Sequence, residues 1–284
     1  MDSSAPTMMN TARTIDGTVG LTKINSKYLH YKQMGSSGDP IVFIHGLGGT
    51  MNYWITVIAA LGLATSHTCH LLDLEGQGLS PTPANTELTI DSLASDIGGI
   101  FQHAHISSSK PAIVIGHSLG CLVSMKFALD NPSLVKKVIL VSPPASPTTE
   151  AAVKGLLQRA EIARTRGMQA LVDVVADGAI AGKATTTNFI AIAASRLSLL
   201  GQDPQGYAKT CGAIAGATTA LKVEDLPANT LLICGDADKV TPPGVSKDYQ
   251  KRIKGSQFVS LNDCGHRPMF EDLDGLAKAI GDFL

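Results

Sequence analysis

Short, wholly apolar runs recur along the chain and alternate with polar or glycine-rich loops. Ile41–Ile44 and Ala112–Ile115 contain no polar side chain, which is the pattern of strands buried on both faces of a parallel sheet. Nearer the start, Thr18–Lys32 instead alternates apolar and polar residues about Asn25–Lys27, and this predicts a hairpin at an antiparallel edge of the sheet. The other expected strands are Cys69–Leu74, Val138–Val141, Leu231–Cys234 and Phe258–Leu261.

Between these runs, apolar residues return at the intervals that place them along one face of a helix. One helix is expected to start at about Tyr53, and three others to span Ile90–His105, Cys121–Ala128 and Glu271–Leu284. Asp91 or Ser92 is the expected N-cap of the helix at Ile90–His105. Strands and helices that alternate in this way predict an α/β fold with a doubly wound, mostly parallel sheet.

Strand signals stop after Val141 and resume only at Leu231. The interval has helical patterning, with breaks at Pro147, Gly167, Gly182 and Asp203-Pro204. An insertion of about 80 residues is too long for a loop, and folds of this kind bind ligands beyond the carboxyl ends of their strands. We therefore expect a lid over the site. The predicted organisation is a flexible leader at 1–17, a core at 18–145 and 228–284, and a helical lid at 146–227.

Composition and charge narrow the function classes. Of the 284 residues, 44% are hydrophobic and 17% are charged, which is enough to bury a large core. A net charge of −1 gives no electrostatic reason to bind nucleic acid or an anionic membrane surface, and no apolar stretch suits a signal peptide or a membrane span. The five cysteines lack C-x-x-C spacing, which favours a reducing compartment and implies no zinc site. We expect a cytoplasmic monomer or homodimer with no metal and no cofactor.

The pentapeptide Gly116–Gly120 follows one of the buried runs and precedes a helical pattern. This context gives a G-x-S-x-G motif its meaning, because the sharp strand-to-helix turn strains the serine and exposes its hydroxyl above the sheet. The turn requires small residues two positions away on either side, and both are glycine. Ser118 is therefore the candidate nucleophile, at the positive end of the following helix.

A serine nucleophile needs a base, and the base needs an acid that orients it. Candidates for both follow later strands of the predicted sheet. Asp236 and Asp238 follow Leu231–Cys234, and His266 follows Phe258–Leu261. Three strand-end loops thus offer serine, acid and histidine in the required order, which strengthens the triad interpretation beyond the serine motif alone.

From about Lys23 onward the chain resembles the α/β-hydrolase superfamily. Four motifs carry the resemblance: His45–Gly49, Asp73–Ser80, Gly116–Gly120, and Gly235–Asp238 together with Gly265-His266. Within the superfamily, the second motif and the run Asp238–Pro242 are similar to those of 3-oxoadipate enol-lactonases and small esterases. Gln77 departs from many relatives, which have histidine there. The resemblance implies an α/β-hydrolase fold with a helical lid inserted after a core strand.

The resemblance also implies roles for particular residues. Asp238 matches the family's G-x-x-D pattern and Pro242-Pro243 stiffens the loop behind it, so Asp238 is the expected acid and Asp236 a loop residue. Two backbone N–H groups form the oxyanion hole, that of Leu119 after the nucleophile and that of Leu47 in the first strand-end loop. Neighbouring glycines let the backbone of this loop approach a tetrahedral intermediate.

For three other residues of these motifs we expect a structural role rather than a catalytic one. His45 and His117 are expected to be structural hydrogen-bonding residues rather than bases, because strand alternation points His117 away from Ser118. Asp73 is expected to brace the Gly76–Gly78 turn.

Three residues are predicted to line the substrate pocket: Gly46, Trp54 and Phe189. For Trp54, core packing is the alternative. The stretch Val175–Ser195 has few charged or bulky residues, which predicts an apolar ceiling suited to an uncharged or lipophilic substrate. The alternative is a carboxylate clamp supplied by lid arginines, for which the candidates are Arg159, Arg164, Arg166 and Arg196.

The function that these residues predict is hydrolysis of a small ester or lactone through an acyl-enzyme. Two alternatives use the same three side chains: hydrolysis of a carbon–carbon bond in a diketone, and a small-molecule receptor that keeps the pocket and turns over slowly. Dehalogenases and epoxide hydrolases of this fold need aspartate as the nucleophile, so Ser118 argues against them.

Overall fold

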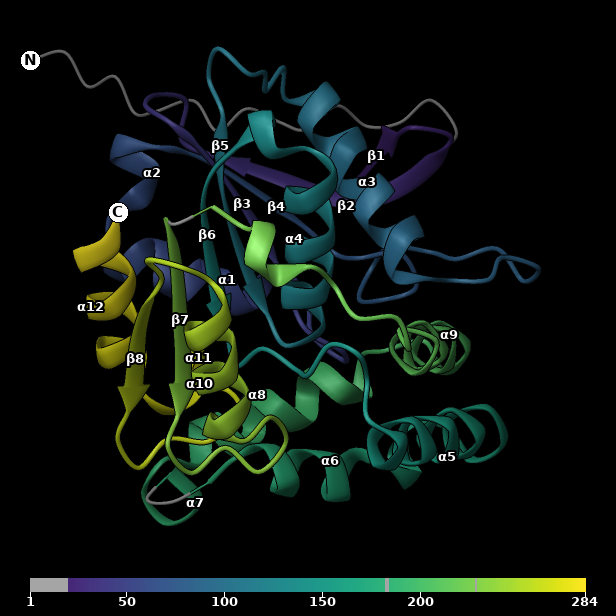
Figure 1. Cartoon of the computed structure of the whole chain (residues 1–284). Coiled ribbons are helices and arrows are strands. Elements are labelled where there is room, and N and C mark those ends of the chain that lie inside the picture. Colours follow the sequence, from purple (N-terminus) through teal and green to yellow (C-terminus); the bar gives the residue numbers. More distant parts are fainter. Residues whose placement is uncertain (1–19, 182–183, 228) are drawn as a thin grey trace, which may run out of the picture.

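The computed structural model describes residues 20–181, 184–227 and 229–284. In this part of the chain eight strands form one sheet in the order β1-β2-β4-β3-β5-β6-β7-β8 (Figure 1). β2 pairs antiparallel with β1 and β4, and the other neighbours are parallel, which confirms the doubly wound, mostly parallel sheet. The strands are β1 (Leu21–Ile24), β2 (Lys27–Met34), β3 (Pro40–Ile44), β4 (Thr68–Leu72), β5 (Ala112–His117), β6 (Val135–Val141), β7 (Thr230–Gly235) and β8 (Gln257–Leu261). The predicted leader at 1–17 and the predicted break at Gly182 lie outside the described residues.

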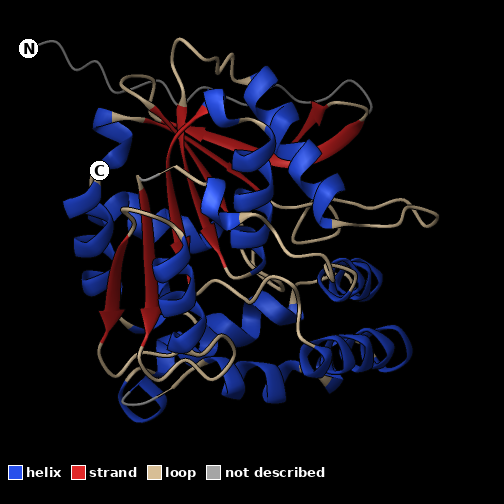
Figure 2. Ribbon diagram, in the orientation of Figure 1, coloured by secondary structure: helices blue, strands red, loops and turns tan. Residues whose placement is uncertain are grey.

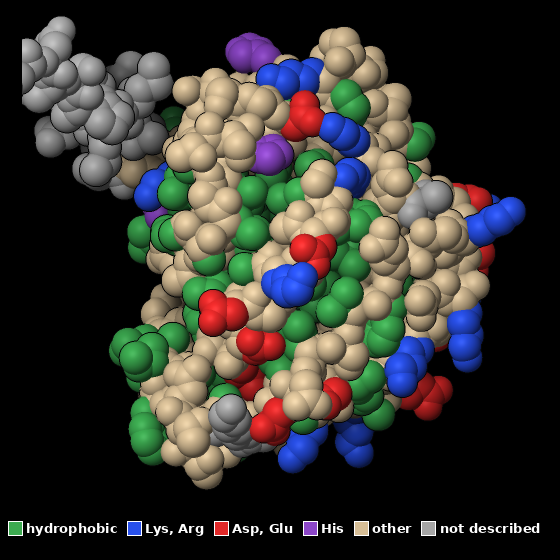
Figure 3. All heavy atoms as spheres, turned by 90° about the vertical axis from the view of Figure 1, so that its left-hand side faces the viewer, with side chains coloured by type: hydrophobic (Ala, Val, Ile, Leu, Met, Phe, Trp, Pro, Cys, Tyr) green, Lys and Arg blue, Asp and Glu red, His purple; other side chains and the backbone are tan. Residues whose placement is uncertain are grey.

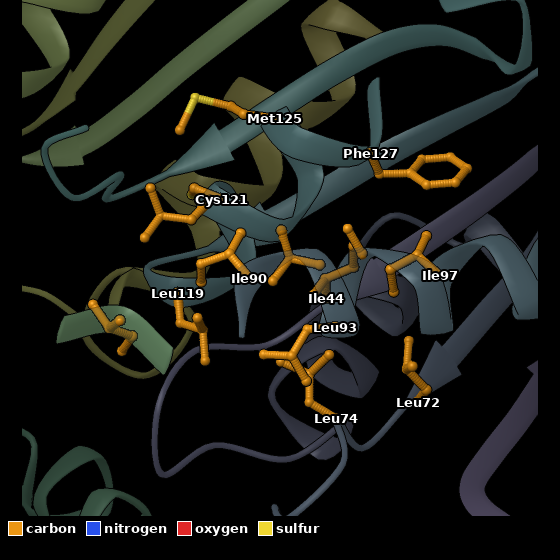
Figure 4. Close-up of a cluster of buried hydrophobic side chains, with 14 of the residues drawn as sticks. Ile44, Leu72, Leu74, Ile90, Leu93, Ile97, Leu119, Cys121, Met125 and Phe127 are labelled. Carbon is orange, nitrogen blue, oxygen red and sulfur yellow. The ribbon is translucent and has the colours of Figure 1, made fainter. Parts of the chain in front are cut away.

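Each strand of the sheet's centre divides its side chains between two apolar cores, one on either face. In β3, Val42 and Ile44 enter the first core, whereas Ile41 and Phe43 enter the second. Helices cover both faces (Figure 2), which is why these strands read as unbroken apolar runs. Figure 4 shows side chains from β3, α3 and α4 that meet in the first core. The first core contains residues of α3 (Ile90–His103), α4 (Leu119–Asp130) and α10 (Pro243–Arg252), and the second contains residues of α1 (Asn52–Ala60), α2 (Leu63–Ser66) and α12 (Leu273–Phe283).

The cap of α3 corrects a local prediction. Thr89, rather than Asp91 or Ser92, is the N-cap: its hydroxyl accepts a hydrogen bond from the backbone N–H of Ser92 at 3.0 Å. In return, the Ser92 hydroxyl accepts from the backbone N–H of Thr89 at 3.0 Å, so the two residues form a reciprocal capping box. Asp91 and Ser92 both lie within the first turn of the helix.

Other element ends differ from prediction by a few residues, and two of these differences have a clear local cause. β4 ends at Leu72, because the next residue, Asp73, already braces the following turn with its carboxylate. The last helix begins at Leu273 instead of Glu271, after a short helix α11 (Pro268–Glu271). Asp272 separates the two and caps α12 by accepting a hydrogen bond from the N–H of Gly275 at 3.0 Å.

The interval between β6 and β7 is helical. Figure 1 shows its helices beyond the carboxyl ends of the parallel strands. There α5 packs along α9, and α6 packs on α8. The helices are α5 (Glu150–Arg166), α6 (Val172–Ala179), α7 (Ala184–Thr187), α8 (Phe189–Leu200) and α9 (Pro204–Ala215). The interval also contains the short 3₁₀ turns η2 (Met168–Ala170) and η3 (Val223–Asp225), whereas η1 (Pro132–Leu134) precedes β6.

The surface carries both signs of charge. On the face shown in Figure 3, acidic and basic side chains are interspersed and neither sign gathers into one large patch, in keeping with the net charge of −1. Within the described ranges, every helix is too short or too polar to cross a bilayer.

Candidate active site

Ser118 lies at the turn from β5 into α4. Its φ of 52° and ψ of −118° are a strained combination for a residue with a side chain, as expected for a nucleophile turn. The two glycines of the motif make the turn feasible. A Cβ at Gly116 would collide with the carbonyl oxygen of Gly120, and a Cβ at Gly120 would collide with that of Ile44. The predicted need for small residues on both sides of Ser118 therefore has a direct steric basis.

Three side chains from three strand-end loops form one hydrogen-bonded chain. The hydroxyl Oγ of Ser118 lies 3.0 Å from Nε2 of His266, and Nδ1 of the same ring lies 2.9 Å from Oδ2 of Asp238. Asp236 lies away from the ring, and its Oδ1 accepts a long hydrogen bond from the N–H of Cys264 at 3.4 Å. Of the two candidate acids, only Asp238 contacts the histidine.

The Asp238 carboxylate is held by its own loop. Its Oδ1 accepts hydrogen bonds from the N–H groups of Val240 and Thr241, both at 2.9 Å, and the Thr241 hydroxyl lies 2.8 Å from Oδ2. Burial alone would raise the pKa of Asp238. The charge and hydrogen bond of His266, together with the Thr241 hydrogen bonds, outweigh burial and lower the pKa from 3.8 to about 2. The carboxylate is therefore ionised throughout the neutral range.

The buried histidines of the two glycine-rich motifs, His45 and His117, serve the backbone. Nε2 of His117 lies 2.8 Å from the carbonyl oxygen of His266, so this ring supports the loop that carries the candidate base. Nε2 of His45 accepts the N–H of Leu74 at 2.9 Å, and its Nδ1 donates to the carbonyl of Gly46 at 2.8 Å. Burial lowers the pKa of both rings, which keeps them neutral. Both have the structural hydrogen bonds that the sequence predicted.

The loop after β3 is fixed by residues of the Asp73–Ser80 motif. Asp73 accepts hydrogen bonds from the N–H groups of Leu79, at 3.0 Å, and Met51, at 2.7 Å, so it braces its own turn as predicted and also the start of α1. Gln77 has a role that the sequence did not reveal. Its Oε1 accepts the N–H of Gly48 at 2.7 Å, which orients the backbone immediately beyond Leu47.

The two predicted oxyanion donors border the same cavity as the hydrogen-bonded chain. Leu47 and Leu119 line it together with Ser118 and His266. Leu119 is the first residue of α4, so its N–H is among those that a helix cannot pair internally. Gly46, which was predicted to line the pocket, lies against the nucleophile turn instead, because a Cβ there would stand 2.9 Å from the Cβ of Ser118, and the cavity lining does not include it.

The cavity has a volume of about 510 Å³ and lies between the strand ends and the inserted helices. Its walls include small residues of α5 and α6, so the prediction of a small-residue ceiling holds for Val175, Gly178 and Ala179 but not for the later part of Val175–Ser195. Arg159 is the one predicted clamp arginine that lines it. Sequence reasoning missed Arg267 and Tyr207, which also line it. For Arg267, the sequence did offer a signal, because the residue directly follows the candidate base His266.

Two predicted pocket residues are placed elsewhere. Trp54 is fully buried in the second core, where its ring packs on Phe43 with centroids 5.6 Å apart, because α1 turns this side chain toward the sheet. Phe189 is 70% exposed. It lies at the start of α8, whose buried stripe is formed by Ala191, Ser195 and Leu199, and Phe189 is off that stripe. Both pocket predictions were wrong.

No group of three His, Cys, Asp or Glu side chains in the described part of the chain gathers as metal ligands would.

A model of the α/β-hydrolase fold family matches residues 39–166. The enol-lactonase from Burkholderia xenovorans LB400 has a similar crystal structure, with a TM-score of 0.83 and 26% identity over 93% of this chain and 98% of that one.

Among curated proteins, the putative carbamate hydrolase RutD of Klebsiella pneumoniae is 27% identical over 87% of this chain and 92% of its own length. The protein of the same name from Variovorax paradoxus is 30% identical, but the match spans only 46% of that relative. The pimeloyl-[acyl-carrier protein] methyl ester esterase of Proteus mirabilis is 27% identical over 89% of this chain and 95% of the esterase.

Proposed function

Because this chain belongs to the α/β-hydrolase superfamily and is a hydrolase, we propose that it cleaves a small ester or lactone through an acyl-enzyme on Ser118. The observation that carries the proposal is the hydrogen-bonded chain from Ser118 through His266 to Asp238 at the wall of a cavity. Relatives named as a methyl ester esterase and an enol-lactonase support an ester or a lactone as the substrate.

In the first half-reaction, Oγ of Ser118 attacks the acyl carbon while Nε2 of His266 takes the hydroxyl proton. The new Oγ–C bond converts the carbonyl oxygen into an oxyanion, which accepts hydrogen bonds from the N–H groups of Leu47 and Leu119. His266 then passes its proton to the leaving alkoxide oxygen as the ester C–O bond breaks. In a lactone that oxygen stays attached to the acyl chain, so ring opening gives a hydroxyacyl-enzyme.

In the second half-reaction, water gives a proton to His266 and attacks the acyl carbon. The tetrahedral intermediate collapses, the Ser118 oxygen leaves, and the proton on His266 returns to it. Asp238 stabilises the imidazolium in both halves and holds the ring so that Nε2 faces Ser118. Its pKa of about 2 keeps it ionised at neutral pH, as this role requires.

The insertion at 146–227 is assigned the role of a lid that selects the acyl or alcohol group. Residues of α5, α6 and α9 border the cavity that Ser118 faces, which supports this assignment. Ala152, Gly155 and Gly178 line the cavity and have little or no side chain, so they leave it wide at these positions. The size of the acyl or alcohol group that fits is therefore limited by the residues at these positions.

A panel of p-nitrophenyl esters with acyl chains of increasing length, together with unsubstituted γ- and δ-lactones, tests the proposal. We expect repeated turnover of at least one ester or lactone, and a loss of kcat of about 10⁴ or more in Ser118→Ala. Release of one equivalent of product followed by arrest would contradict a hydrolase and favour a slow receptor. Wild-type rates in Ser118→Ala would remove Ser118 from the mechanism.

A further inference from the structure

The charged side chains that line the cavity of Ser118 are all basic. They are Arg159 on α5, Lys239 after β7, and Arg267 beside His266. Among the described residues, no aspartate or glutamate lines this cavity, and most of the remaining lining is apolar or small. The cavity is therefore electropositive for a ligand that enters it.

Arg267 is 3% exposed, yet no acidic side chain in the described ranges pairs with its guanidinium. The groups that its guanidinium contacts are neutral: Nη1 donates a hydrogen bond to Oγ of Ser195, and the guanidinium carbon lies 5.8 Å from the ring centroid of Tyr53. Two half-buried arginines differ, since Arg196 and Arg252 each pair with a carboxylate. A buried cation without a counter-charge is costly, and a ligand anion would supply the missing partner.

Glu271 lies four residues after Arg267 along the chain, but its carboxylate is engaged by backbone. Oε1 accepts the N–H of Arg267 at 2.8 Å, and Oε2 accepts the N–H groups of Gly265 at 2.8 Å and Ala181 at 2.9 Å. These contacts build the loop that follows His266. They leave the guanidinium of Arg267 without a carboxylate.

A second, independent feature is the hydroxyl of Tyr207 on α9. Tyr207 is fully buried and lines the same cavity. Among residues 20–181, 184–227 and 229–284, no group stands in good hydrogen-bond geometry to its Oη, although the Arg159 guanidinium and the Cys211 thiol lie close enough to interact with it. Burial raises the pKa of this phenol, whereas the nearby charges of Arg159 and Arg267 act in the opposite direction. An unpaired buried hydroxyl close to two cations is a donor that a bound anion would satisfy.

We propose that the cavity binds a carboxylate-bearing ester or lactone, with Arg267 and the Tyr207 hydroxyl as the groups that hold the carboxylate. The inference rests on the hydrolase function proposed above and names its substrate class. A carboxylate suits these two groups, because the guanidinium gives one N–H to Ser195 and, together with the Tyr207 hydroxyl, has donors left for two anionic oxygens. A carboxylate-bearing substrate differs from the uncharged substrate that the apolar pattern of Val175–Ser195 predicts.

A matched pair of esters tests this assignment. Mono-p-nitrophenyl adipate carries a free carboxylate, and p-nitrophenyl 6-methylheptanoate has an isopropyl group in its place. We expect the wild-type kcat/KM, corrected for spontaneous hydrolysis, to favour the adipate ester by about 10-fold or more. In Arg267→Met the ratio of the two kcat/KM values should fall by about 10-fold or more, and in Tyr207→Phe by about 5-fold. Arg267→Lys, which keeps the charge, should recover part of the ratio.

Arg196→Met is the matched control, because Arg196 lies on α8 at the surface and pairs with Asp173. Its ratio should equal that of the wild type. A purely structural Arg267 would affect both esters alike, so an unchanged ratio in both Arg267→Met and Tyr207→Phe would overturn the proposal. If Arg267→Met does not fold, Tyr207→Phe and Arg267→Lys decide it by the same ratio.

Binding of adipate to Ser118→Ala, measured by calorimetry, separates this inference from the proposed function. We expect adipate to bind and neutral adipamide to bind at least 10-fold more weakly, with the difference lost when Arg267→Met is added. Absence of Ser118-dependent turnover of every ester, with adipate binding intact, would refute the hydrolytic function and retain the carboxylate site. Turnover without any Arg267-dependent preference or binding would refute the site alone.

Discussion

At the scale of single residues, Asp236 and Asp238 differ in what surrounds each carboxylate. Asp238 contacts Nδ1 of His266 and is held by the N–H groups of Val240 and Thr241, whereas Asp236 has only a long contact with the N–H of Cys264. The sequence alone left both acids open, because each follows the same strand. The resemblance to a G-x-x-D pattern selected Asp238, and the structure shows the reason for the spacing: two more residues bring the carboxylate to the ring.

Asp238→Asn should lower kcat by about 10⁴, because the amide cannot stabilise the imidazolium or impose the same tautomer on His266. Asp236→Asn is the matched control and should keep most of the activity, with a loss of about 1 kcal/mol or less of unfolding free energy. Steady-state kinetics and denaturant unfolding of both variants measure this. An inactive Asp236→Asn beside an active Asp238→Asn would reverse the assignment.

The same carboxylate predicts a pH dependence of stability. Its pKa falls from 3.8 to about 2 on folding, so the folded state binds the proton less tightly than the unfolded chain. The stabilisation is fully present above the unfolded value and is lost as pH falls from about 4 toward about 2; its size is about 2 kcal/mol. Unfolding free energies measured between pH 5 and pH 2 should therefore fall about 2 kcal/mol further in the wild type than in Asp238→Asn. Parallel curves for the two proteins would contradict this.

At the scale of elements, unbroken apolar runs predicted the central strands β3, β5, β6 and β7, because a strand covered on both faces has few polar positions to confuse the pattern. The helix α10 (Pro243–Arg252) was missed for the converse reason. Only Val245 and Tyr249 in it are bulky and apolar, and one turn of spacing is too short a pattern to recognise. The N-cap Thr89 was also missed, since three neighbouring residues are all good caps and only the tertiary geometry distinguishes them.

The turn between β5 and α4 makes its own prediction. Gly120→Ala places a Cβ against the carbonyl oxygens of Ile44 and His45, which are backbone atoms of a central strand and its loop. We expect a loss of about 2 kcal/mol or more in unfolding free energy and a large loss of activity. Gly212→Ala on α9 is the control, because its Cβ would meet nothing within 4 Å. That variant should gain up to about 1 kcal/mol from helix propensity, and a comparable loss in both variants would refute the steric argument.

At the scale of the whole molecule, the sheet presents the nucleophile turn, the acid loop and the histidine loop at one edge, and the inserted helices close the space above them (Figure 1). The sequence predicted this arrangement from the order of elements. It predicted only part of the inserted lining, because a helical pattern gives the buried face but not the neighbour that covers it. Phe189 illustrates the limit: it is the bulkiest residue of its stretch and lies in solvent.

Filling the cavity from the insertion should change substrate choice. Gly155 lines the cavity and its added Cβ would meet nothing within 4 Å, so a leucine there extends into open space. Gly155→Leu should lower the ratio of kcat/KM for hexanoyl over acetyl p-nitrophenyl esters by about 10-fold or more. Gly212→Leu, which does not border this cavity, should leave the ratio unchanged. Equal effects of the two variants would remove the selecting role from the insertion.

The central claim is that Ser118 forms an acyl-enzyme, and the most direct measurement is mass spectrometry of the protein quenched during turnover of a p-nitrophenyl ester. We expect the intact mass to rise by one acyl group at early times, and peptide mapping to place that group on Ser118, with no adduct in Ser118→Ala. Turnover with no acyl adduct at any time, or an adduct that persists in Ser118→Ala, would contradict the account.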